Sequence, residues 1–268
     1  MDVGLEIFND AGIEQISSNG VNFALVHKEV INSMSAWTAI SGPRAAGLTY
    51  SFAVAATSPV VAVATSATGQ SGAVFAFVTS TGTNQWSVQL YGGASETSVS
   101  SPGVVTLNAT VVVYVFDVAP APTSGPGLAV YNASGVCVFN AAYPGMRVVQ
   151  MLDDNNNMHG YGTSLTPPSG KTYAVSQRAS WGQLIIGSVN ATTGDRIANM
   201  YRFGVSGGYA GATVQFGYGY PCFINGAFSL PHGASGAVGN IYATSGCNDG
   251  GSPRTYFSDG IVIDVTNL

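Results

Sequence analysis

Hydrophobic and polar residues alternate with a period of two along much of this 268-residue chain. In residues 48–55 (LTYSFAVA), every second residue is large and apolar, and the residues between are Thr, Ser and Ala. Residues 85–90 (QWSVQL) and 213–220 (TVQFGYGY) repeat this pattern. Such alternation is typical of β-strands with one buried and one wetter face. Residues 111–118 (VVVYVFDV) and 260–265 (GIVIDV) are rich in β-branched residues, which predicts strands covered on both faces.

Helical patterning is weak throughout the chain. Residues 22–34 (NFALVHKEVINSM) come closest to a helical period, but their Val and Ile content and their alternation favour a strand at least as well. Turn pairs such as Asn225-Gly226 and Asp259-Gly260 tolerate the positive φ angles of tight hairpins. These patterns predict an all-β fold.

A short phrase occurs twice, as GLEIFNDAG at residues 4–12 and as GLAVYNASG at residues 127–135. Each copy reads as a strand followed by an Asn-x-x-Gly turn and a return strand, which predicts a β-hairpin. Neither copy has the glycine spacing of a phosphate-binding loop. Each predicted unit closes on an apolar strand that ends in Asp-Val, at Asp117 and at Asp264, and the equivalent places of these two aspartates favour a structural role.

Between the two copies, residues 119–126 contain three prolines and no charge, which is typical of a semi-extended spacer. We therefore expect two β-sandwich-like modules related by duplication. The first would span residues 1–118, and the second, with longer loops, would span residues 127–268. Residues 119–126 would form the Pro/Gly-rich linker. The alternative is a chance similarity between two short hairpins in a sequence of low complexity.

Charged residues make up only 8% of the chain, against roughly 25% in an average soluble domain. A surface of Ser, Thr, Asn and Gly suits permanent assembly. The net charge is −5, with no basic patch, so we expect neither nucleic-acid binding nor membrane insertion. The start of the chain lacks the pattern of a signal peptide. The three cysteines predict free thiols in a reducing cytoplasm, with a Cys222–Cys247 bridge as the alternative.

Catalytic chemistry finds little support in the sequence, so we expect no enzyme, no cofactor and no metal. No nucleophile elbow or zinc-protease motif is present, and His27 is expected to be a solvated strand residue. The polar run that begins with Asp153, Asp154 and Asn155 lacks the spacing of a calcium loop. It reads as a turn or exposed loop, with a cation site or a ligand-contact loop as alternatives.

Tyrosines are frequent in the second half of the chain and offer contact area with a polar tip, which suits protein interfaces and sugar stacking. The alternative for these rings is packing in the core. The candidate interface or ligand contacts, taken with the polar run, are Asp153, Asp154, Asn155, Tyr161, Tyr209, Tyr218 and Tyr220.

The repeated opening, GL-x-[IV]-[FY]-N-x-x-G followed by a short apolar strand, resembles small structural proteins of tailed-bacteriophage tails, in the minor-tail, tail-tip or baseplate group. The resemblance implies a β-sandwich virion protein without catalytic residues. We expect it to be made in the host cytoplasm, to reside in the virion tail, and to bind other tail proteins and copies of itself; a trimer is expected by analogy with tail fibres. The alternatives are a receptor- or carbohydrate-binding module that contacts a host glycan or protein, and a head-decoration or capsid protein. A glycan hydrolase or esterase is the least favoured reading.

Overall fold

The computed structural model describes residues 6–8, 14–17, 20–32, 36–42, 45–69, 72–95, 103–104, 107, 109–121, 127–152, 163–177, 181–189, 196–230, 254–256 and 260–268. The described residues form β-strands joined by turns and include a short 3-10 helix, η3 (Tyr209–Gly211). The predicted all-β fold is confirmed. Among these residues no helix is long and apolar enough to span a membrane.

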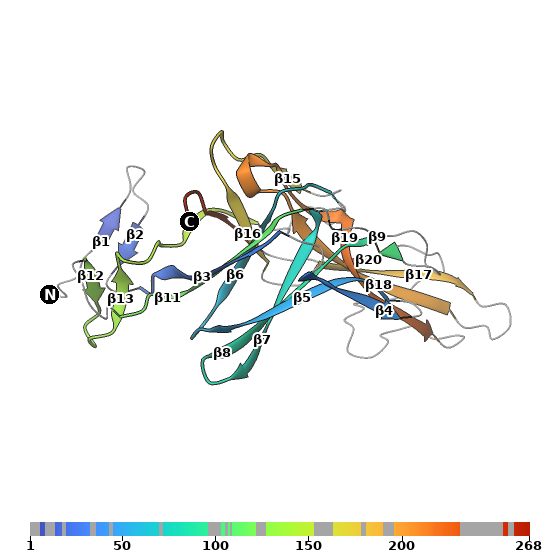
Figure 1. The fold of residues 1–268 in the computed structure, drawn as a ribbon, viewed down its shortest axis with the longest axis horizontal. Coiled ribbons are helices and arrows are strands. Elements are labelled where there is room, and N and C mark those ends of the chain that lie inside the picture. The colour runs from blue at the N-terminus through green and yellow to red at the C-terminus, as the bar shows by residue number, and fades with distance from the viewer. Residues whose placement is uncertain are drawn as a thin grey trace.

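A six-stranded antiparallel sheet lies at the centre of the molecule (Figure 1). Its strand order is β14–β21–β16–β6–β11–β3. The bounds are β14 (Arg147–Leu152), β21 (Gly260–Asp264), β16 (Tyr173–Gln177), β6 (Val60–Thr65), β11 (Val111–Val118) and β3 (Phe23–Ile31).

A second, nine-stranded sheet follows the order β15–β19–β5–β8–β7–β18–β17–β20, with β4 paired to β5. The bounds are β15 (Thr163–Leu165), β19 (Val214–Leu230), β5 (Ala45–Ala55), β8 (Gln85–Gly92), β7 (Val74–Gly82), β18 (Arg196–Ser206), β17 (Trp181–Val189), β20 (Arg254–Tyr256) and β4 (Thr38–Gly42). A small sheet pairs β9 (Ala94–Ser95) with β10 (Gly103–Val104).

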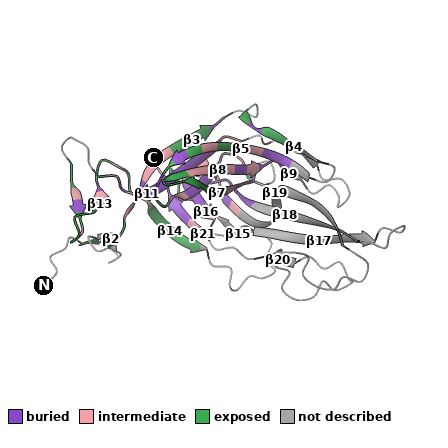
Figure 2. Cartoon of the chain, turned by 90° about the horizontal axis from the view of Figure 1, so that it is seen from below, coloured by how far each residue is buried: buried purple, intermediate pink, exposed green. Residues whose placement is uncertain are grey.

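The two large sheets pack face to face over an apolar core, as in a β-sandwich. Val111, Val113 and Val115 of β11 face Val88 and Leu90 of β8 in this core. The other face of β11 belongs to a second buried cluster, so β11 is buried on both faces (Figure 2). The prediction that residues 111–118 form a strand covered on both sides is therefore confirmed.

The pairing of the six-stranded sheet repeats between its two ends. Asp117 of β11 lies opposite Ala24 of β3, and Asp264 of β21 lies opposite Arg147 of β14. Ala24 and Arg147 are 123 positions apart (147 − 24), the spacing of the repeated phrase. Strands β14, β21 and β16 are thus equivalent to β3, β11 and β6, and the two sets lie in opposite order along the sheet.

Each edge strand of this sheet also carries one extra residue at the same place. In β3 the register skips Val26, because His27 and Leu25 pair with consecutive residues of β11. In β14 the register skips Val149 in the same way, and Val149 follows Val26 by the same 123 positions (149 − 26). A shared β-bulge means that both edge strands bend at the same point.

The halves of the sheet are joined in two places. In the middle, Val63 of β6 lies opposite Val175 of β16. At the other side the sheet curls back on itself, because the Met146 N–H donates to the Phe23 carbonyl oxygen at 2.8 Å. Phe23 and Met146 are again 123 positions apart (146 − 23). The sheet therefore consists of two equivalent halves that meet between β16 and β6.

The expected division into two separate β-sandwiches does not match this arrangement. Both large sheets contain strands from before and after residues 119–126, as in the β6–β16 and β5–β19 pairs. One buried cluster contains Ala62 and Phe116 together with Ala174 and Ile263. The boundary fails because β6 and β16 would each be an exposed sheet edge if the two units folded apart. The start of the proposed linker is also packed, with Ala119 only 4% exposed.

The strand predictions agree well with the structure, with one local exception. Residues 48–55, 85–90, 213–220 and 260–265 fall largely within β5, β8, β19 and β21, and residues 22–34 contain β3. The turn predicted at Asn225-Gly226 is wrong, because both residues lie inside β19. The pairing of β19 with β18 shifts register near this point, so the dipeptide accompanies an irregularity of a long strand.

Gly208 joins the two halves through its backbone. It bridges Thr65 in a parallel pair, and its carbonyl oxygen accepts a hydrogen bond from the Tyr173 N–H. Its φ of 88° is unfavourable for other residues, and a Cβ atom there would overlap the Tyr173 carbonyl oxygen. Gly208 is therefore required both by its backbone conformation and by the space around it.

We expect Gly208→Ala to lower the free energy of unfolding by about 3 kcal/mol or more, through combined strain and overlap. Gly170 is the matched control, because its φ is 77° and a Cβ atom added there would have no neighbour within 4 Å. Gly170→Ala should cost only about 1–2 kcal/mol, from backbone strain alone. Urea unfolding of both variants measures the difference, and equal losses would contradict the close approach at Gly208.

Candidate interaction surface

The repeated phrase forms two hairpins with the same pairing. In the first hairpin, β1 (Glu6–Phe8) pairs with β2 (Glu14–Ser17); in the second, β12 (Ala129–Tyr131) pairs with β13 (Cys137–Asn140). Phe8 lies opposite Glu14 as Tyr131 lies opposite Cys137, and both registers shift just before the aromatic residue. The predicted hairpins are confirmed.

These hairpins lie together at one end of the long axis of the molecule, apart from the two large sheets (Figure 1). Strands β2 and β13 contact each other. A two-stranded hairpin in isolation is only marginally stable in water. The position of the hairpins therefore depends on contacts with each other and with the central sheet.

The turn of the second hairpin is built by Asn132. Its side-chain Oδ1 accepts hydrogen bonds from the N–H groups of Ser134 and Val136, at 3.0 and 2.9 Å. Gly135 follows with a φ of 76°, the left-handed conformation expected for the glycine of this turn. The Asn-x-x-Gly spacing therefore fixes the turn and leaves both strands in register.

Two asparagines fasten this hairpin to the central sheet. Asn22, just before β3, donates from Nδ2 to the Val138 carbonyl oxygen at 2.8 Å. Asn140 donates from Nδ2 to the carbonyl oxygen of Pro120 at 2.9 Å. Because Pro120 follows β11, the second hairpin is held against the ends of two strands from the first half.

Apolar side chains are exposed on both hairpins. Phe8 and Tyr131 occupy equivalent positions, and they are 52% and 48% exposed. The other large apolar side chains exposed on or beside these hairpins are Ile7, Leu128 and Val136. Exposed aromatic and aliphatic side chains on an anchored element are typical of a protein interface. We call these five residues the hairpin surface.

The charge near the hairpin surface is negative. Glu6 of β1 is exposed, and the sequence places Asp2, Asp10 and Glu14 in the same segment, with no Lys or Arg before Lys28. Residues 127–140 carry no charged side chain at all. A partner that presents apolar side chains with a basic rim would complement this surface.

Most of the residues singled out from the sequence lie where the structure describes no side chain. Asp153, Asp154, Asn155 and Tyr161 lie outside the described residues. Tyr218 and Tyr220 lie on β19, where only the backbone is described. The prediction of a contact loop or tyrosine platform therefore stays a prediction.

Tyr209 has a clear position in η3. It is half-buried and packs against the cluster that contains Tyr114. Burial and, to a smaller extent, the nearby Tyr209 raise the pKa of Tyr114 to about 12. The ring of Tyr209 therefore serves the core, the alternative weighed for the tyrosines.

Polar side chains of β3 and β5 connect the two large sheets. The Tyr50 hydroxyl donates to Glu29 Oε1 at 2.7 Å, and this hydrogen bond, with burial and the carboxylate charge, raises the pKa of Tyr50. Glu29 Oε2 also lies 3.3 Å from His27 Nε2, and the His27 ring lies against Phe52 with centroids 5.3 Å apart. His27 is thus half-buried, and it is more enclosed than the solvated strand residue expected from the sequence. These side chains tie the two sheets together.

The two Asp-Val strand ends have structural roles, as the sequence favoured. Asp117 accepts hydrogen bonds from the N–H groups of Thr57 and Ser58, at 2.5 and 2.8 Å. These residues lie in the loop before β6. Asp264 reaches toward the loop before β16, where Lys171 Nζ lies 2.9 Å from Oδ2. Each aspartate therefore fixes the loop that leads into its neighbouring strand.

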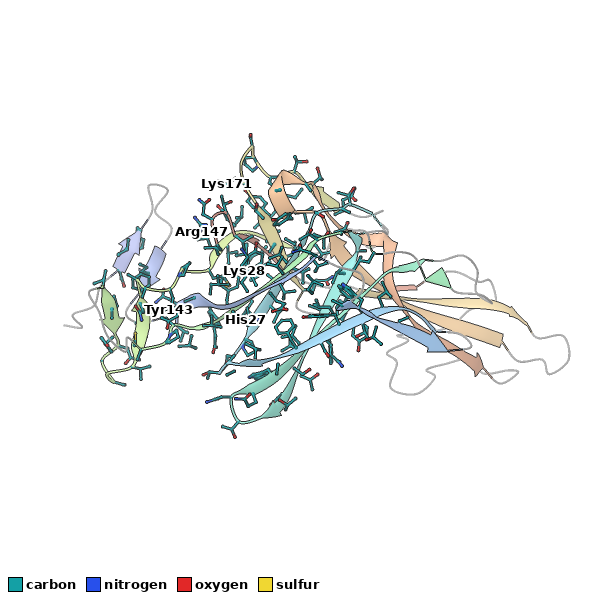
Figure 3. All side chains as sticks on the ribbon, viewed as in Figure 1. His27, Lys28, Tyr143, Arg147 and Lys171 are labelled. Atoms are coloured by element: carbon teal, nitrogen blue, oxygen red, sulfur yellow. The ribbon has the colours of Figure 1, made fainter. Side chains whose placement is uncertain are left out.

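Asp264 has further partners that hold the end of the chain in place. The Thr266 N–H donates to its Oδ1 at 2.9 Å, and Arg147 Nη2 lies 3.7 Å from the same oxygen. Figure 3 labels the two cationic partners of Asp264, Arg147 and Lys171. Burial alone would raise the pKa of Asp264, but the hydrogen bonds from Thr266 and Lys171, with the Arg147 charge, lower it on balance. The carboxylate is therefore stabilised in its charged form.

Within the described ranges, no three His, Cys, Asp or Glu side chains come together in a way that could hold a metal ion. Cys137 is a free, buried thiol. Cys222 lies on β19, where only the backbone is described, and Cys247 lies outside the described residues, so their pairing stays untested. The described part of the chain offers contact surfaces, and its polar groups are used to hold loops and sheets together.

Comparisons with protein-family models, with curated proteins and with solved structures gave no match.

Sequence reasoning missed the exposed apolar side chains. The repeated phrase marked the hairpins, but Phe8 and Tyr131 read equally well as core residues of a strand. The signal was present in the shared aromatic character of one position in both copies (8 and 131). Deciding that this position faces outward required the spatial arrangement of the hairpins.

We expect Asp264→Asn to lower the free energy of unfolding by about 1–2 kcal/mol at neutral pH, because charged hydrogen bonds are lost. A carboxyl whose folded-state pKa is depressed stabilises the fold above its unfolded pKa of about 3.9, and this stabilisation is lost as the pH falls through the folded pKa. The gap between wild type and variant should therefore close below about pH 4. Chemical unfolding across pH measures it. Lys171→Met should reproduce part of the neutral-pH loss, and a gap that persists undiminished into strong acid would contradict this role.

Proposed function

We propose that this chain is a structural protein that works through protein–protein interfaces, in the tail tip or baseplate of a bacteriophage. The hairpin surface is the observation that carries the proposal. It presents exposed apolar side chains at equivalent places on two hairpins, of which the second is anchored to the central sheet, with Phe8 and Tyr131 each about half exposed. Rigid, exposed aromatic side chains are frequent hot spots of interfaces.

The anchoring of the hairpins supports a binding role. Hydrogen bonds from Asn22 and Asn140 fix the second hairpin against the central sheet, and Asn132 fixes its turn. A surface ordered before binding loses little conformational entropy on association. The few charged residues of the chain favour a permanent contact, because little solvation must be removed.

The phage-tail setting rests on the resemblance of the repeated opening to tail structural proteins. The proposed partners are other tail proteins and copies of this chain, and the proposed location is the virion tail. The acidic character of the first hairpin segment fits a neighbour with a basic rim.

We also propose that the two halves arose by duplication. The support is the repeated register: both hairpins, both edge strands and both edge bulges recur at a spacing of 123 residues. Each half would then be one copy of a unit whose strands now interlock within shared sheets.

In a phage that encodes this chain, mass spectrometry of purified particles should detect it. The double variant Phe8→Asp with Tyr131→Asp should enter particles at least about tenfold less, because charges placed in a dry contact are costly. Phe77→Asp is the control, because Phe77 is also about half exposed but lies on β7, away from the hairpins.

Circular dichroism must show that the variants retain the β fold before incorporation is compared. Absence of the wild-type chain from particles would overturn the virion role. Normal incorporation of the folded double variant would show that the hairpin surface is not the interface.

The duplication predicts that the chain tolerates circular permutation at residues 122–126. In the wild type, residues 119–126 connect Val118 to Gly127. If the halves are equivalent, a copy of this segment should also connect Val265 to Gly4 in the permutant. The permutant should melt within a few degrees of the wild type, roughly the effect of 1 kcal/mol. A permutant with a two-residue connection is the control and should fail to fold. Failure of both, while a chain cut only at residues 122–126 stays folded, would contradict the equivalence.

A further inference from the structure

Strand β14 lies at one end of the six-stranded sheet. Among the described strands it pairs only with β21, on one side. The edge of a sheet presents a row of backbone N–H and C=O groups that can pair with an added strand. The free side of β14 is therefore a template for one further strand.

Three side chains of β14 are apolar and exposed. Val148 and Val149 are 48% and 47% exposed, and Met151 is 74% exposed, the highest value among the exposed large hydrophobic side chains of the described residues. Because the bulge lies at Val149, these side chains fall on both faces of the strand. Such a strand would expose less apolar surface if another strand lay beside it.

The equivalent edge strand, β3, is built differently. Residues of β3 and β14 that are 123 positions apart are equivalent. By this spacing, Gln150, Met151 and Leu152 of β14 correspond to His27, Lys28 and Glu29 of β3. Charged residues, and Lys above all, are the usual protection of a sheet edge against further pairing. One edge of the sheet is therefore protected, and the equivalent edge is not.

The charges on the edge strands favour β14 of another molecule over β3 of another molecule as the strand that pairs with β14. Residues 148–152 are uncharged, so two copies can lie side by side without repulsion between like charges. The only charge on β14, on Arg147, is occupied by Asp264 and by the Thr266 carbonyl oxygen. Pairing of β14 with β3 of another molecule would instead place apolar residues against the charged edge.

We propose that β14 pairs in antiparallel fashion with β14 of a second copy of this chain. The pairing joins two six-stranded sheets across a two-fold axis, and it uses the same residues on both copies. An isologous contact of this kind closes after two molecules. The charged edge strand β3 takes no part in this pairing.

This contact deepens the proposed function by naming a second copy as one partner, yet it does not depend on the phage setting. It predicts a dimer, or a larger assembly with an even number of chains, in place of the trimer expected by analogy with tail fibres. The hairpin surface is separate from β14 and stays available for a different partner.

The test is the mass of the full chain in solution over a dilution series, by analytical ultracentrifugation. The wild type should dimerise, and Met151→Lys should weaken dimerisation by about tenfold or more, because it gives β14 the residue type that protects β3. Val30→Lys is the matched control: Val30 is 46% exposed on the opposite edge strand, and this variant should dimerise like the wild type.

A wild-type chain that stays monomeric, or that forms trimers, would overturn the proposal. So would a dimer unaffected by Met151→Lys, or one weakened equally by Val30→Lys, which would indicate a contact between β14 and β3. If Met151→Lys does not fold, hydrogen exchange of wild-type residues 147–152 decides: their protection should rise with chain concentration, and unchanged protection would overturn the contact. None of these results alters the particle test of the hairpin surface, so the two proposals fail separately.

Discussion

The pairing of β6 with β16 is the constraint on which the rest of the fold depends. Ala62 and Ala64 of β6 are fully buried, so this strand cannot serve as a sheet edge in water. It needs β11 on one side and β16 on the other, and β16 comes from the second half of the chain. Once these two strands pair, β6 and β16 become interior strands, and β3 and β14 remain as the two end strands of the sheet. The location of every exposed backbone edge of this sheet follows from that single contact.

Local features of the fold could be predicted from the sequence because they depend on short-range rules. Alternation identified β5 and β8, the Asn-x-x-Gly spacing identified the Asn132 turn, and runs of β-branched residues identified β11 and β21 as strands. The order of strands could not be predicted in the same way. Two halves that fold apart and two halves that share sheets have the same alternation, and only the complete burial of β6 distinguishes them. Asn225-Gly226 shows the same limit, since a pair that suits a turn also suits an irregular point in a long strand.

The candidate surface was harder to predict than the strands. A polar loop and several tyrosines were predicted as contact residues because their side chains can form hydrogen bonds. Tyr209, however, is half-buried and packs against the core cluster that contains Tyr114. The exposed residues are instead ordinary apolar ones, such as Phe8 and Met151, whose chemistry gives no sign of an interface. Their significance comes from position: one lies on a hairpin held away from the large sheets, and the other lies on an unpaired edge. Position depends on strand order, which the sequence pattern leaves open.

The equivalent halves make each difference between them informative. If one unit was duplicated, both edge strands began with the same residues and the same need for protection from further pairing. His27, Lys28 and Glu29 meet that need on β3, and Lys28 is additionally held by the Leu268 carbonyl oxygen and lies over the Tyr114 ring. On β14 the corresponding residues carry no charge, although Met151, like Lys28, is exposed. A solvent-exposed edge gains nothing from such a change, whereas an edge covered by another strand does. The asymmetry between two otherwise matching strands is therefore the feature of this fold that best supports the proposed pairing of β14 with a second copy.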